Sequence, residues 1–155
     1  MDRIGLEILH QELLADARVL QDSVRLARQR LLQSSDSSTE SCGYHLNRFY
    51  NILERGFERI SESFENHLDK RGDYHVKLIE RMMLELPGIR PAFLSHDLLE
   101  PLRELKGFRH VFRHAYDLSL SRERLEPLVH HAEHIAEEFP VRIESFVDAV
   151  KRELE

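Results

Sequence analysis

The residues best suited to chemistry lie close together, between positions 103 and 116 of the sequence. Basic, imidazole and phenol side chains recur there at short spacings: Arg103, Lys106, Arg109, His110, Arg113, His114 and Tyr116. Histidine takes up and releases protons near neutral pH, and a guanidinium binds a phosphate through two parallel hydrogen bonds. Such a set suits metal-free cleavage of RNA, in which the ribose 2′-hydroxyl attacks its own phosphate with the help of a base and an acid.

The same stretch has the apolar spacing of an amphipathic helix, with Leu98, Leu102, Leu105, Phe108, Phe112 and Ala115 on one face. At about 100° per residue, Arg109 and Tyr116 flank this apolar face, whereas Arg103, Lys106, His110 and His114 share a separate polar face. Arg109 and His114 are about 140° apart around the axis, so they cannot stack on one another. They can converge through the long arginine side chain, or through a second copy of the helix in a twofold dimer.

Composition favours one ordinary domain spanning residues 1–155, long enough to bury a core. The net charge of −6 argues against bulk attraction to nucleic acid, but residues 101–116 carry four cations against Glu104, a local excess of about three positive charges. Cys42 is the single cysteine, so no internal disulfide is possible. No apolar run is long enough to span a bilayer, and we expect a cytoplasmic protein.

Apolar periodicity predicts an all-α, up-and-down bundle of about five helices. Long helices are expected over residues 6–33, 46–68 and 125–150, a short one after Asp73, and the basic helix from a start between Ser95 and Glu100. Residues 34–43 are rich in serine and predict a polar loop between the first two helices. Pro101 fits only the first turn or a kink, and Pro140 predicts a bend or two abutting pieces.

Spacing alone leaves other interpretations open. With 10 histidines and 18 arginines in the chain, about one Arg-x4-His is expected by chance, so Arg109 and Arg113 could simply pair with glutamates of neighbouring helices. His130 and His134 share a helix face and could hold a metal in a histidine-rich bundle, although no convincing third and fourth ligands follow. We therefore expect no metal and no cofactor.

The segment Gly107-Phe-Arg-His-Val-Phe-Arg-His-Ala-Tyr116 resembles the Arg-x4-His-x-Tyr pattern of HEPN domains, and more narrowly of HepT-like toxins. The resemblance covers residues 98–137 and implies the fold and function that follow. It implies a homodimeric, metal-independent endoribonuclease toxin of a type VII toxin–antitoxin system, with Arg109 and His114 cleaving RNA and His110 assisting. The basic residues Arg103, Lys106 and Arg113 are expected to bind the RNA.

The resemblance also implies a partner and a modification. HepT-like toxins are usually silenced by an MNT-type nucleotidyltransferase antitoxin, which attaches AMP to the motif tyrosine, here Tyr116. An adenylate would add negative charge beside the proposed phosphate site and so oppose RNA binding. The alternative is a non-catalytic HEPN-like module that only docks a nucleotidyltransferase.

Overall fold

The chain folds into a bundle of α-helices in the computed structural model, which describes residues 1–33, 35–65, 71–114 and 119–154. The elements are α1 (Arg3–Leu31), α2 (Asp36–Phe64), α3 (Tyr74–Met83), the short 3-10 helix η1 (His96–Leu98), α4 (Leu99–His114) and α5 (Arg122–Glu153). Within these ranges there is no strand, only an isolated bridge between Leu86 and Arg90. The prediction of an all-α bundle is confirmed.

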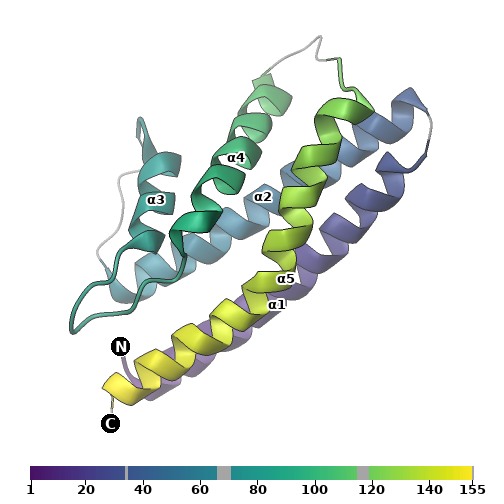
Figure 1. Cartoon of the computed structure of the whole chain (residues 1–155). Coiled ribbons are helices and arrows are strands. Elements are labelled where there is room, and N and C mark those ends of the chain that lie inside the picture. Colours follow the sequence, from purple (N-terminus) through teal and green to yellow (C-terminus); the bar gives the residue numbers. More distant parts are fainter. Residues whose placement is uncertain (34, 66–70, 115–118, 155) are drawn as a thin grey trace.

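The core forms where the apolar faces of the three long helices meet. In Figure 1, α1, α2, α4 and α5 alternate in direction, and α1 lies alongside α5 with both chain ends at the same end of the bundle. Leu13, Leu53 and Ile143, one from each long helix, are completely buried. Gly56 faces both neighbours, and a Cβ there would make ordinary van der Waals contacts, at 3.4 Å from the Phe139 ring and 3.6 Å from Leu13.

The first interhelical connection is shorter than the sequence predicts. We expected a polar loop over residues 34–43, but α2 begins at Asp36, so most of that stretch is helical and the prediction is wrong. The reason is a capping box: the Ser35 hydroxyl accepts from the Ser38 amide, while the Ser38 hydroxyl accepts from the Ser35 amide. The serines that indicate a loop by composition here satisfy the free amides at a helix start.

Pro101 lies at a position that helices tolerate, whereas Pro127 and Pro140 lie in the interior of a helix. Pro101 lies in the first turn of α4, directly after η1, where its missing N–H removes no helix hydrogen bond. Pro127 and Pro140 both lie inside α5, which continues unbroken through them. Ser121 caps the start of α5, because its hydroxyl accepts from the Arg124 amide.

The connection between α3 and α4 is fixed by a buried arginine. Arg90 is completely buried and donates to both Glu65 at the end of α2 and the backbone carbonyls of Arg81, Leu84 and Pro91. Phe93 then inserts between Phe57 of α2 and Phe139 and Phe146 of α5. These contacts set the positions of α3 and of the start of α4 relative to the core. None of the described helices has the length and apolarity that crossing a membrane requires.

Candidate active site

A cleft of about 400 Å³ lies between the start of α3 and the second half of α4. Residues 72–76 form one wall, including Asp73 and His75. The other wall is α4, which contributes Lys106, Arg109, His110, Arg113 and His114. Five of the residues singled out in the sequence therefore face one cavity in a single chain.

Arg109 is held against α2. Its Nε donates to the Asn51 Oδ1 at 2.6 Å, and its Nη2 lies 4.0 Å from a carboxylate oxygen of Glu54. The guanidinium carbon also lies 5.9 Å from the centre of the buried Tyr50 ring. The sequence left open that Arg109 pairs with a neighbouring glutamate, and the structure shows such a contact at the outer limit of an ion pair. A guanidinium has five N–H donors, so these contacts leave donors for a ligand in the cleft.

The two histidines of the motif lie one above the other on exposed positions of α4. Their ring centres are 4.6 Å apart, with the planes tilted by 30°. The His114 Nδ1 lies 2.8 Å from the backbone carbonyl of His110. A carbonyl only accepts, so Nδ1 carries the proton and the lone pair of the neutral ring is on Nε2. His110 thereby orients the His114 ring through its backbone carbonyl, and the two rings lie close to one another.

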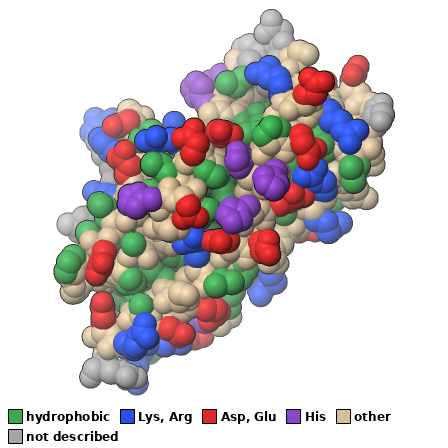
Figure 2. All heavy atoms as spheres, viewed as in Figure 1, with side chains coloured by type: hydrophobic (Ala, Val, Ile, Leu, Met, Phe, Trp, Pro, Cys, Tyr) green, Lys and Arg blue, Asp and Glu red, His purple; other side chains and the backbone are tan. Residues whose placement is uncertain are grey.

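The predicted RNA-binding residues divide into two sets. Lys106 and Arg113 line the cleft, whereas the exposed Arg103 lies on the same helix outside it. Figure 2 shows basic, acidic and histidine side chains mixed over the viewed face of the molecule, without one broad basic surface. The lining of the cleft itself carries three cations, Lys106, Arg109 and Arg113, against the carboxylate of Asp73.

Tyr116, the predicted modification site, lies outside the residues that the structure describes, as does Ala115. The described part of α4 ends at His114, which lines the cleft. The prediction for Tyr116 stays a prediction.

Glu54 and His75 belong to the site but were not predicted from the sequence. The His75 Nδ1 lies 2.7 Å from the Glu54 Oε2, so one buried carboxylate contacts both His75 of α3 and Arg109 of α4. Burial and the neighbouring Glu54 carboxylate raise the pKa of Tyr50, which stays a neutral phenol. A signal for Glu54 was available, because it lies four residues after Tyr50 and three before Phe57 on one face of α2, where a carboxylate must find buried partners.

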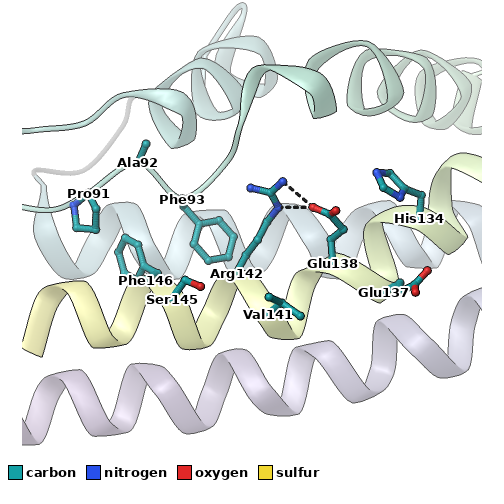
Figure 3. Close-up of a pocket in the computed structure, with 10 residues that line it drawn as sticks. All are labelled: Pro91, Ala92, Phe93, His134, Glu137, Glu138, Val141, Arg142, Ser145 and Phe146. Atoms are coloured by element: carbon teal, nitrogen blue, oxygen red, sulfur yellow. Dashed lines mark hydrogen bonds and ion pairs between the residues drawn. The ribbon is translucent and has the colours of Figure 1, made fainter.

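A larger cavity, of about 600 Å³, lies away from this site, between residues 91–93 and α5. Figure 3 shows Arg142 and Glu138 pointing toward one another there, with Phe93 and Phe146 forming the apolar wall. Ligand atoms of Asp97, His134 and Glu138 lie within 4.8 Å of one another beside it. The Glu138 carboxylate accepts from Arg142 at 2.6 Å, so a metal ion would have to compete with that guanidinium. Among the described residues, His134 therefore lies near Asp97 and Glu138, and His130 does not belong to this group of possible ligand atoms.

Comparison with known proteins identifies the family. Residues 41–150 match the family model described as HepT-like protein, and this match includes α3, α4 and the whole cleft. No curated protein and no solved structure matches the chain. The matched region covers more than half of the 155 residues, and the chain therefore belongs to the HepT-like proteins, a HEPN-type family of toxin–antitoxin systems.

Proposed function

We propose that this protein is the toxin of a type VII toxin–antitoxin pair and acts as a metal-independent endoribonuclease. The observation that carries the proposal is the convergence of Arg109, His110 and His114 on one cleft with Lys106 and Arg113. An arginine and a base with a fixed tautomer are two of the groups that 2′-hydroxyl transesterification uses. Membership of the HepT-like family supports the same reaction.

The chemistry follows from the positions of these side chains. The His114 Nε2 takes the proton of a ribose 2′-hydroxyl, whose oxygen then forms a bond to the adjacent phosphorus. The bond from phosphorus to the 5′ oxygen breaks, and that oxygen takes up a proton as it leaves. Arg109 donates hydrogen bonds to the phosphate oxygens, on which negative charge grows in the transition state. The products are a 2′,3′-cyclic phosphate and a free 5′-hydroxyl.

Lys106 and Arg113 bind the phosphates on either side of the scissile bond, and Arg103 extends the basic surface along α4. Because the molecule has a net charge of −6, attraction of RNA depends on these few cations. RNA binding is therefore expected to weaken steeply as salt is raised.

The active species is proposed to be a homodimer. An apolar groove of about 380 Å³ runs beside the motif helix, lined by Phe108 and Val111 of α4 and by Leu125 and Leu128 of α5. Val111, in the last turn of α4, is 41% exposed and adds to the apolar surface beside this groove. A second copy of the chain fits such a surface, and Val111→Glu is expected to give monomers in light scattering.

Silencing is proposed to come from an MNT-type nucleotidyltransferase that attaches AMP to Tyr116. The residue follows His114 by two positions in the sequence, and an adenylate on it adds negative charge, which opposes the binding of RNA phosphates. Co-expression with such an enzyme is expected to add the mass of one adenylate and to stop cleavage. Tyr116→Phe is expected to prevent both effects.

The test uses purified protein, free of partner and in EDTA, with a mixed RNA substrate. Wild type is expected to cleave, whereas Arg109→Ala and His114→Ala are each expected to lose cleavage and growth arrest with an unchanged helical circular dichroism spectrum. Undiminished cleavage by either variant overturns the catalytic assignment. Absence of cleavage by the wild type favours a docking module for a nucleotidyltransferase instead.

A further inference from the structure

The cleft contains an imidazole that the Arg-x4-His motif does not include. His75 is the second residue of α3, and it faces His110 and His114 of α4 from the opposite wall. Its side chain is 37% exposed, which leaves it accessible to a ligand in the cleft. The transesterification proposed above needs a group that protonates the leaving 5′ oxygen, and His114 already serves as the base.

The orientation of His75 is fixed by Glu54. The carboxylate is 10% exposed and accepts from the His75 Nδ1 at 2.7 Å. An ionised carboxylate only accepts, so Nδ1 carries the proton and Nε2 is the ring nitrogen that remains for the cleft. Among the described residues, none makes a hydrogen bond or ion pair with Nε2.

The charges around the two imidazoles differ in sign. His75 has the Glu54 carboxylate at hydrogen-bond distance, an arrangement that orients the ring. His114 has the His110 ring 4.6 Å away and lies on the same wall of the cleft as Lys106 and Arg113. Cleavage by general acid–base catalysis needs two groups in different roles, and these unlike contacts distinguish the two rings.

We propose that His75 is a further catalytic residue, the general acid of the cleavage reaction, positioned by Glu54. This inference rests on the proposed ribonuclease function and completes it within one chain. As the bond from phosphorus to the 5′ oxygen breaks, the His75 Nε2–H donates its proton to that oxygen, and His75 becomes neutral. His114 gains the proton of the 2′-hydroxyl in the same turnover, so the cyclic phosphate and the 5′-hydroxyl form without any further reagent. Exchange of protons with water restores both rings.

Glu54 also connects the acid to the phosphate-binding arginine. One of its oxygens contacts His75 and the other lies 4.0 Å from the Arg109 Nη2. Glu54 is thus a positioning residue for both side chains, and it orients groups from α3 and α4 from its own position on α2.

The experiment varies the leaving group. The cleavage position of wild type is first mapped on an RNA, and a second RNA is then made with sulfur in place of the bridging 5′ oxygen at that position. A thiol has a pKa near 8.5, whereas water, which stands here for a hydroxyl leaving group, has a pKa near 15.7. A thiolate is therefore stable enough to leave without taking up a proton from an acid. His75→Gln is expected to slow cleavage of the oxygen RNA by about 10² to 10⁴-fold, while cleavage of the sulfur RNA stays within about tenfold of wild type. His114→Gln is expected to slow both.

The matched control is His10→Gln, because His10 also pairs with a glutamate on another helix, Glu144 at 2.9 Å, but lies outside the cleft. It is expected to cleave both RNAs as wild type does. If His75→Gln cleaves the oxygen RNA at the wild-type rate, or loses both RNAs equally, His75 is not the acid. If wild type cleaves neither RNA, the ribonuclease function itself is refuted and this inference fails with it.

Discussion

Replacement of Arg109 separates the structural from the catalytic contribution of one side chain. Its shortest contact with the fold is a charge-assisted hydrogen bond of 2.6 Å to Asn51, whose side chain is itself exposed to solvent. A hydrogen bond to a charged group contributes about 1.5–3 kcal/mol net. A domain of this kind has roughly 5–15 kcal/mol of stability. Arg109→Ala is therefore expected to lower the free energy of unfolding by only a part of this total and to stay folded.

The expected effect on cleavage is larger. Loss of one donor aimed at developing charge costs about 10² to 10³ in rate, or about 2.7–4 kcal/mol. Arg109→Lys keeps the charge but loses the two parallel hydrogen bonds, so it is expected to recover little of the activity. Urea unfolding and single-turnover cleavage, measured on the same preparations, give the two quantities.

Arg25 provides the control for this experiment. Arg25→Ala removes an arginine that is 64% exposed and pairs with Asp22 on its own helix, and it is expected to leave cleavage unchanged. Cleavage by Arg109→Ala within about threefold of wild type would show that the guanidinium does not bind the reacting phosphate. A loss of cleavage that simply follows unfolding in urea would give Arg109 a structural role only.

Three further predictions concern the framework of the site. Arg90→Ala leaves Glu65 with one cation fewer in a buried network, and calorimetry is expected to show a loss of about 3–5 kcal/mol. Gly107→Ala is expected to raise the free energy of unfolding by about 0.5–1 kcal/mol, since no atom lies within 4 Å of the new Cβ. Gly43→Ala is expected to give no such increase, because its Cβ would lie 2.9 Å from atoms of two side chains. Burial raises the pKa of Cys42 to about 11, so at pH 8 the thiol is protonated and alkylation by iodoacetamide is expected only after denaturation; rapid labelling of native protein would contradict this.

The sequence predicted the helices and the basic wall of the cleft because both follow from local spacing. The stripe through Leu102 and Leu105 is buried in α4, and the polar residues opposite it face the cleft. The prediction was wrong where one local pattern is compatible with two structures. Ser35 and Ser38 indicate a loop by composition but form a capping box in the structure.

The partners of the motif lie too far away in the sequence to be predicted. Asn51 precedes Arg109 by 58 residues, and Glu54 precedes His75 by 21. Their convergence depends on how α2, α3 and α4 pack. This packing depends in turn on Arg90 and Phe93, which lie in the connection between α3 and α4. Periodicity identifies the buried face of each helix but not which polar residues of two faces will meet.

The most direct test of the account is the chemistry of the RNA ends that the purified protein produces in EDTA. We expect a 2′,3′-cyclic phosphate on the upstream fragment and a 5′-hydroxyl on the downstream fragment, because the ribose hydroxyl is the nucleophile and neither water nor a side chain attacks the phosphorus. Fragments with a 3′-hydroxyl and a 5′-phosphate, or RNA that remains intact, would contradict it.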